Sequence, residues 1–224
     1  MVSLLFPYAP SYSKQQVNFV FVTVLRNSWH DKRPDLNFIP EQYTQRVGNC
    51  WAVAYYRQWY MLMRLNGIPL TDLSIESLMD GVSQRHKGRG HGLRNFQAVA
   101  DFMKKEGHVV DMVLHENPFG KSEDESFEKK NLDLFEKWTS GGAYQGLLSP
   151  TSVEIERHEY EFCKTHHAST LMGRGVYIED GKEPKEYWDI YESYGLDWGQ
   201  RGDIRLARHE GLIISAVEMK LKAN

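Results

Sequence analysis

The sequence predicts an α+β fold in two lobes, built by a single domain over residues 1–224. Helix-like patterns dominate the first half of the chain, and strand-like patterns dominate from about residue 150 onward. A run of helices followed by a run of strands is typical of α+β architectures. With 224 residues, 41% of them hydrophobic, the chain is long enough for one such domain. We expect a helical lobe over about 45–115 and a β-rich lobe over about 130–224.

Three helices are expected in the first half. Residues 50–65 contain no Gly or Pro, are rich in Met, Leu and Ala, and are followed by an Asn-Gly stop signal. A shorter helix is expected over 70–82, and either Thr71 or Ser74 is suited to cap it. The third helix is expected over 95–107, where a Gly ends the pattern.

The predicted strands are rich in β-branched and aromatic residues and are bounded by turn-forming residues. One strand, VNFVFVTVL at 17–25, precedes the helices, and residues 29–49 carry the Pro and polar residues of an extended connector. The later strands are expected in VVDMVLHEN, ASTLMGRGVYIED, EYWDIYESY, GDIRLAR and GLIISAVEMKL.

Composition argues against several classes of function. The net charge of −3 gives no basic field for nucleic acid, and no apolar run approaches the roughly 18 residues that span a bilayer. The two cysteines, Cys50 and Cys163, cannot build a disulfide framework, and the N-terminus is a poor secretory signal. We therefore expect a cytoplasmic or nuclear protein with no nucleic-acid partner and no membrane partner.

A Gly-rich basic loop, SQRHKGRGHGLR at 83–94, separates two of the predicted helices. Its two histidines are five residues apart, and the nine histidines of the chain include no clean zinc spacing. The loop also lacks the aromatic residues on which single-stranded nucleic acids stack. We expect no metal and no cofactor.

The sequence GNCWA places Cys50 at the start of the helix expected over 50–65. Unpaired N–H groups and the positive end of the helix dipole favour a thiolate at such a position. A cysteine nucleophile also needs a base, usually His, an orienting partner for that base, and donors for the oxyanion. The alternative is that Cys50 is a core residue, because free cysteines are among the most buried residue types.

GNCWA, with Gln45 upstream, resembles the nucleophile segment of the papain-like cysteine peptidases, although the second cysteine of that motif is absent and Gln45 lies one residue closer. Three further segments resemble the family in the same order. They are FEKWTSGGAYQG at 135–146, His167-Ala168 followed by Gly173, and YWDIYESYGLDWGQRGDIRLAR at 187–208. The resemblance implies a papain-like two-lobe fold, in which a helical lobe and an antiparallel β-barrel-like lobe face each other across an active-site cleft.

The resemblance also implies catalytic roles. Cys50 aligns with the nucleophile, His167 with the base, and Gln45 with the oxyanion donor. Glu192 stands where the family has Asn. A carboxylate accepts the same hydrogen bond from His167, and its charge favours a thiolate–imidazolium pair. The same charge also opposes release of the proton to the leaving amine.

Further residues match positions of the family motifs. Tyr194 replaces the Trp that shields the bond between the base and its partner, and Trp198 is expected to cover the same bond. The residues expected to support the active site are Trp51, Tyr194 and Gly199. Those expected to bind substrate are Gly90, Gly92 and Trp198.

Two residues shortly before His167 in the sequence are expected to have no catalytic role. His166 adjoins His167, and neighbours on a strand face opposite sides, so we expect His166 at the surface. Cys163 is expected to be a buried, small apolar side chain.

The implied function is thiol-dependent hydrolysis of peptide bonds by an endopeptidase that acts on a peptide or protein substrate, and control by a partner or inhibitor protein is compatible with it. A catalytically inactive papain fold that binds a peptide or protein partner is the alternative. A transferase or deamidase, with the same thiol chemistry and another acyl acceptor, is a third reading. The 224 residues include no counterpart of the family's inhibitory pro-segment, so we expect another means of control.

One departure concerns the fold itself. The strand that opens the family's second lobe is not visible between Gly107 and Phe135, whereas residues 17–25 form an extra strand of that kind. We expect this N-terminal strand to complete the β-rich lobe, as a local permutation of the family layout. The alternative is an ordinary added edge strand.

Overall fold

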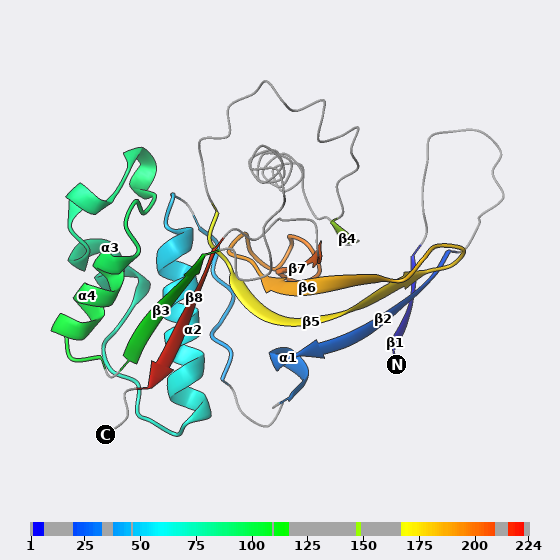
Figure 1. Cartoon of the computed structure of the whole chain (residues 1–224), viewed down its shortest axis with the longest axis horizontal. Helices are drawn as coiled ribbons and strands as arrows, with labels where there is room; N and C mark the ends of the chain where they lie inside the picture. The colour runs from blue at the N-terminus through cyan, green and yellow to red at the C-terminus, as the bar shows by residue number, and fades with distance from the viewer. Residues whose placement is uncertain are drawn as a thin grey trace.

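The structure, a computed structural model, describes residues 2–6, 20–32, 38–45, 47–108, 110–116, 147–148, 167–208 and 215–221. Its elements fall into a helical lobe and a sheet lobe that lie side by side (Figure 1). The predicted α+β architecture with two lobes is therefore confirmed.

The helical lobe is centred on α2 (Cys50–Leu65), against which α3 (Ile75–Gly81) and α4 (Gln97–Lys105) lie. The open choice of cap for α3 is resolved, because Ser74 forms a capping box with Ser77. Within the described residues, no helix is long and apolar enough to cross a membrane. The hydrophobic core of this lobe is formed chiefly by the buried side chains of Trp51, Trp59, Met63, Leu78, Val99 and Met103.

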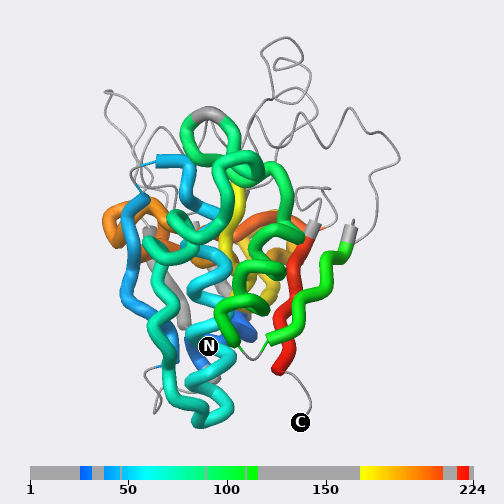
Figure 2. Tube along the Cα trace, turned by 90° about the vertical axis from the view of Figure 1, so that its left-hand side faces the viewer, coloured from blue at the N-terminus to red at the C-terminus, as the bar shows by residue number. Residues whose placement is uncertain are grey.

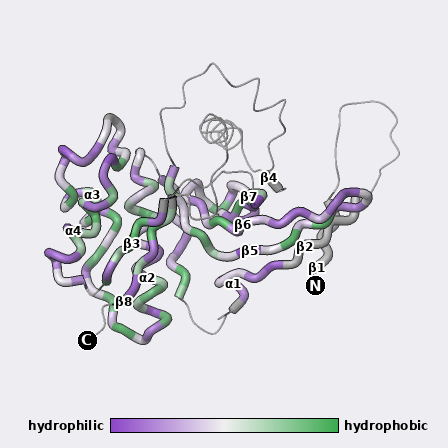
Figure 3. Tube along the Cα trace, in the orientation of Figure 1, coloured by the Kyte–Doolittle hydropathy of each residue, from purple (hydrophilic) through white to green (hydrophobic). Residues whose placement is uncertain are grey.

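Two strands far apart in the sequence complete the helical lobe. β3 (Val110–Glu116) pairs antiparallel with β8 (Ser215–Leu221), and the two run side by side in Figure 2. Met219 of β8 is buried in the same core cluster as the helices. The last described strand therefore lies with the helical lobe and not with the β-rich lobe predicted over 130–224. In β8 apolar and charged residues alternate from Val217 to Leu221, so this strand can bury one face, and Figure 3 shows hydrophobic and hydrophilic residues along it.

The sheet lobe contains six strands in the order β1-β2-β5-β6-β7-β4. All neighbouring pairs are antiparallel except β4 and β7, which are parallel. A short helix, α1 (Trp29–Lys32), follows β2 where the sequence predicted the start of an extended connector. The strands are β1 (Val2–Phe6), β2 (Val20–Ser28), β4 (Leu147–Leu148), β5 (Thr170–Glu179), β6 (Lys185–Tyr191) and β7 (Asp203–Ala207).

The N-terminal strand β2 pairs with β5, from Val22 opposite Glu179 to Ser28 opposite Gly173. It therefore joins the sheet of the second lobe, on the edge of β5 that β6 leaves open. This pairing is the one that the permutation hypothesis requires, although an added strand at the same edge would pair in the same way. Residues 17–19 of the predicted strand lie outside the described residues.

A partly buried ion-pair cluster ties β2 to the rest of the sheet. Arg26 on β2 donates from Nε to Asp189 on β6 and from Nη2 to Asp203 at the start of β7, each at 2.8 Å. The Asp189 side chain is almost fully buried. Burial opposes the charge of Arg26, yet the two carboxylates outweigh it and raise the pKa of the guanidinium. β2 is therefore an integral strand of this lobe in the folded protein.

Close packing of β2 on β5 makes Gly173 sensitive to substitution. A Cβ at Gly173 would meet the carbonyl oxygen of Asn27 and would lie 2.6 Å from Cα of Ser28. We expect Gly173→Ala to lower the free energy of unfolding by about 1–3 kcal/mol, measured by urea denaturation. Gly92→Ala is the control, because nothing lies within 4 Å of the Cβ position there. Equal stability of the two variants would contradict this packing.

Candidate active site

Cys50 is the first residue of α2 and is 7% exposed. The turn before it is tight, because Asn49 N–H donates to Val47 O at 2.7 Å and Gly48 N–H donates to Gly90 O at 2.9 Å. The cap residue, Asn49, makes no side-chain cap hydrogen bond to the helix. The first N–H groups of α2 thus remain available near the thiol, as the sequence predicted for a nucleophile.

His167 and Glu192 come together at one end of the sheet. His167 lies just before β5 and Glu192 just after β6, and the antiparallel pair β5–β6 brings these ends together, with Thr170 opposite Tyr191. His167 Nε2 donates to Glu192 Oε2 at 2.6 Å. The two side chains are 8% and 0% exposed. Charge-assisted hydrogen bonds of this length are among the stronger ones in proteins.

Cys50 completes the group from the opposite lobe, through a hydrogen bond to His167. Burial alone would raise the pKa of the Cys50 thiol. The hydrogen bond and the charge of His167, helped by the backbone N–H groups of Ala168 and Trp51, instead lower it. Burial alone would likewise lower the pKa of His167, but Glu192 and the Cys50 sulfur raise it to about 10. The arrangement favours a thiolate beside an imidazolium.

Two aromatic rings cover this pair. Tyr194 stacks on the His167 ring, with centroids 5.1 Å apart and planes 12° from parallel, and its Oη lies 3.5 Å from Nδ1. Trp198 packs on Tyr194 with centroids 5.1 Å apart. Trp198 is 6% exposed, so its covering role fits the geometry better than a broad contact with substrate. Gly199 follows with a φ of 57°, a conformation that favours Gly.

Gln45 is held by the residue that follows Glu192. Its backbone N–H donates to Ser193 O at 2.7 Å, and the Ser193 hydroxyl donates to Gln45 Oε1. This fixes the amide orientation and leaves the NH₂ group of Gln45 as a donor. Sequence reasoning missed Ser193, although it stands inside the ESYG stretch that carried the resemblance.

The Gly-rich loop lies against the start of α2. Trp51 Nε1 donates to His91 O at 2.9 Å, and Gly90 accepts from Gly48. Gly90 is exposed and has a φ of 76°, and Gly88 N–H donates to Gly92 O at 2.6 Å. The loop backbone therefore borders the thiol, and the substrate contacts expected of Gly90 and Gly92 stay predictions.

Some predicted features fall elsewhere. His166, Cys163 and the segment 135–146 lie outside the described residues. Among the residues that are described, no group of three or more His, Cys, Asp or Glu side chains is placed to hold a metal ion.

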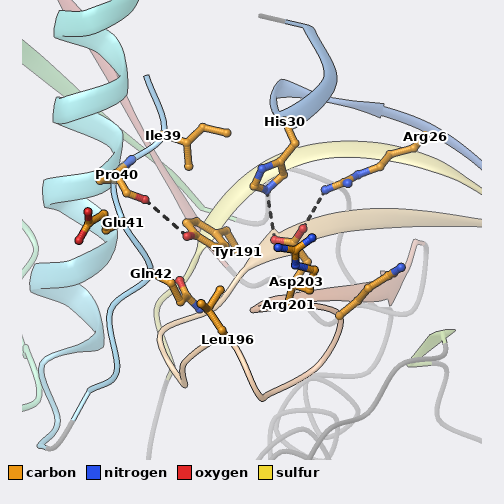
Figure 4. A pocket seen from close by; sticks show the side chains of 11 residues that line it. Arg26, His30, Ile39, Pro40, Glu41, Gln42, Tyr191, Leu196, Arg201 and Asp203 are labelled. Atoms are coloured by element: carbon orange, nitrogen blue, oxygen red, sulfur yellow. Dashed lines mark hydrogen bonds and ion pairs between the residues drawn. The ribbon is translucent and has the colours of Figure 1, made fainter. Parts of the chain in front are cut away.

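A pocket of about 620 Å³ lies beside the sheet and not at the thiol. Arg26, His30, Tyr191 and Asp203 are among the residues that line it, whereas Cys50 is not. Figure 4 shows both Arg26 and His30 directed at Asp203, with His30 Nε2 at 3.1 Å from its carboxylate. Arg26, His30 and Asp203, three polar residues that line the pocket, are thus already paired with one another.

The chain is similar to known cysteine peptidases in sequence and in fold. No protein-family profile matches the chain. The KDEL-tailed cysteine endopeptidase CEP2 of Arabidopsis thaliana is 26% identical over 180 residues, which cover 73% of this chain and 49% of that relative. Cathepsin C of Schistosoma mansoni is 32% identical over 65 residues, which cover 29% of this chain and 14% of the relative.

Among solved structures, the digestive procathepsin L2 proteinase from Tenebrio molitor larval midgut has a TM-score of 0.57 and 16% identity, over 88% of this chain and 68% of that one. The chain thus has the papain-like fold, and its sequence relatives are papain-like cysteine peptidases. It spans about half the length of the plant relative, and a smaller share of cathepsin C.

Because Glu192 is hydrogen-bonded to His167, we expect the reactivity of Cys50 to depend on this one carboxylate. We expect iodoacetamide to alkylate the protein readily at pH 6, well below the pKa of about 8.5 of a free thiol. Glu192→Gln weakens the imidazolium, so the pKa of Cys50 rises and alkylation at pH 6 slows about tenfold or more. The measurement is the rate of alkylation against pH.

A second His–Glu pair supplies the control for that experiment. His115 Nε2 and Glu218 Oε2 lie 3.1 Å apart on the exposed face of β3 and β8. Glu218→Gln is expected to leave the pH profile unchanged. Superimposable profiles for the wild type and Glu192→Gln would contradict the electrostatic role of Glu192.

Proposed function

We propose that the protein is a papain-like cysteine endopeptidase that hydrolyses peptide bonds through Cys50. The observation that carries the proposal is the hydrogen-bonded series Cys50–His167–Glu192 at the start of α2. Nucleophile, base and orienting carboxylate are each within hydrogen-bond reach of the next, which is the general requirement for an activated thiol.

In the proposed reaction the Cys50 thiolate attacks the carbonyl carbon of the scissile peptide. The NH₂ group of Gln45 and the backbone N–H of Cys50 stabilise the resulting oxyanion. The C–N bond then breaks, His167 gives its proton to the leaving amine, and a thioester remains on Cys50. Water attacks the thioester carbonyl while His167 takes a proton from it, the C–S bond breaks, and the acid product leaves Cys50 as a thiolate beside the imidazolium.

Glu192 changes the balance of these steps compared with a neutral amide at the same position. A carboxylate stabilises the imidazolium, which favours the attacking thiolate. The same interaction, which raises the pKa of His167 to about 10, makes proton donation to the amine less favourable. We therefore expect a readily formed thiolate and a slow proton transfer to the leaving amine, which limits the rate at which the acyl-enzyme forms.

The high pKa of His167 also supports the alternative that the fold binds a peptide or protein partner without cleaving it. An imidazolium that keeps its proton still leaves a formed thiolate but no general acid. The two functions differ in turnover and not in the reactivity of Cys50.

Incubation with an epoxysuccinyl-peptide inhibitor, followed by intact mass measurement, tests the activated thiol. We expect one adduct on the wild type and on Cys163→Ala, and none on Cys50→Ala, because Cys50 is the thiol hydrogen-bonded to His167. A folded wild type that forms no adduct would overturn the proposed function. An adduct together with cleavage of peptide amides supports the peptidase, and an adduct without cleavage supports the binding protein or a transferase.

The border of the site suggests a class of substrate. Residues 81–100 contain no Asp or Glu, and the loop 83–94 within them carries four Arg or Lys residues. Arg85 and Arg94 are exposed, and neither forms an ion pair with any carboxylate among the described residues. A peptide lying along this loop would meet an excess of positive charge.

We therefore expect peptides with Glu near the scissile bond to be cleaved faster than matched peptides with Lys, by about fivefold at low salt. Arg94→Gln should reduce this preference. Arg64→Gln is the control, because Arg64 is exposed in the last turn of α2, at the opposite end from Cys50. The comparison uses kcat/KM for each peptide pair, and a preference that is unchanged in Arg94→Gln would contradict the role of the loop.

A further inference from the structure

Arg57 is a charged residue in the interior of the protein. It lies on α2 about two turns after Cys50, and it is 1% exposed. Burial lowers the pKa of Arg57 to about 10, against the opposing effects of Tyr191, Glu192 and Asp203, so the guanidinium is charged near neutral pH. Buried charges are costly unless they are paired, so its surroundings indicate its role.

Its contacts converge on the residue that orients the base. Nη1 donates to Glu192 O at 2.9 Å and to Tyr191 O at 3.1 Å, and the guanidinium lies 3.9 Å from the centroid of the Tyr191 ring. Nη2 donates to Gln42 Oε1 at 2.5 Å, and Gln42 Nε2 donates to Glu192 O at 2.8 Å. The backbone of Glu192 is therefore held by α2 and by the segment 38–45, from two directions.

Arg57 also affects the balance of charge at the site. If the orienting residue were a neutral amide, the negative charge of the thiolate and the positive charge of the imidazolium would cancel. With Glu192, the group Cys50–His167–Glu192 carries one negative charge in excess, and the carboxylate is fully buried. Oε1 of Glu192 has no hydrogen-bond partner among the described residues. A buried net charge is unfavourable, and the guanidinium of Arg57 supplies the missing positive charge.

We propose that Arg57 is a positioning residue that makes Glu192 usable in place of a neutral amide, both by fixing its backbone and by balancing its charge. The inference rests on the proposed function, since it concerns the same group of residues. In this proposal Arg57, on the same helix as Cys50, supports Glu192 in the other lobe. The other charged or titratable groups that face Arg57 are Tyr191 and Asp203.

A double-mutant cycle with Arg57→Gln and Glu192→Gln separates charge balance from simple packing. Gln retains hydrogen-bond donors but removes the positive charge. In the wild-type background, Arg57→Gln should slow alkylation of Cys50 at pH 6 by about tenfold and shift the profile to higher pH. In the Glu192→Gln background, where no excess negative charge remains, the same change should alter the rate by less than about threefold. Equal losses in both backgrounds would overturn the proposal.

Two further variants sharpen the result. Arg57→Lys retains the charge and should recover most of the wild-type pH profile, which a purely steric role would not predict. Arg205→Met is the matched control, because Arg205 is also buried over a tyrosine ring, 5.7 Å from the centroid of Tyr187. It should leave the pH profile unchanged.

The same cycle is read from the free energy of unfolding in urea, which does not need a reactive thiol. If the wild type shows no activated thiol but the two changes are still coupled in stability, the proposed function fails and the charge balance stands. If the thiol is activated and the changes are additive in both readouts, the inference fails alone. An Arg57→Gln variant that unfolds while the double variant folds would support the proposal, and unfolding of both would overturn it.

Discussion

The hydrogen bond between His167 and Glu192 is the interaction on which the rest of the site depends. It is 2.6 Å long, almost sealed from water, and made by side chains that flank two paired strands. Its strength raises the basicity of the imidazole, which in turn stabilises the thiolate at the start of α2. The aromatic cover of Tyr194 and Trp198 keeps solvent away and so maintains the low dielectric in which the pair is strong.

This constraint explains why the surrounding polar groups are arranged as they are. A buried carboxylate needs a rigid backbone and a nearby positive charge, and Arg57 is placed to supply both. Ser193, directly after Glu192, orients Gln45 from the other segment of the chain. The turn from Tyr191 to Tyr194 is therefore the point at which the connector 38–45, α2 and the sheet meet.

Much of the site could be predicted from the sequence, because its residues stand in short motifs whose order along the chain is informative. Cys50, His167 and Glu192 were expected together, and the structure brings them together. Ser193 and Arg57 were missed for different reasons. Ser193 acts through a side chain that local sequence does not orient, and Arg57 stands on a helix whose spacing indicates only an apolar core.

The fold was predictable at the level of its elements but not of all their partners. The strand pattern of 215–221 is clear, yet a strand carries little local information about its neighbour. It pairs with β3 and buries Met219 in the helical lobe, although its position in the sequence suggested the other lobe. The two residues offered as caps for α3 were distinguishable only by the reciprocal bonds between Ser74 and Ser77.

The pairing of β2 with β5 has a consequence for how the protein matures. Ser28 and Met172 are hydrogen-bonded although they are 144 residues apart in the sequence. A ribosome would therefore release β2 long before its partner β5 exists, and the sheet next to His167 cannot close until nearly the whole chain has emerged. The group Cys50–His167–Glu192 is thus assembled among the last structures to form, and a truncated translation product would contain the cysteine without His167 and Glu192.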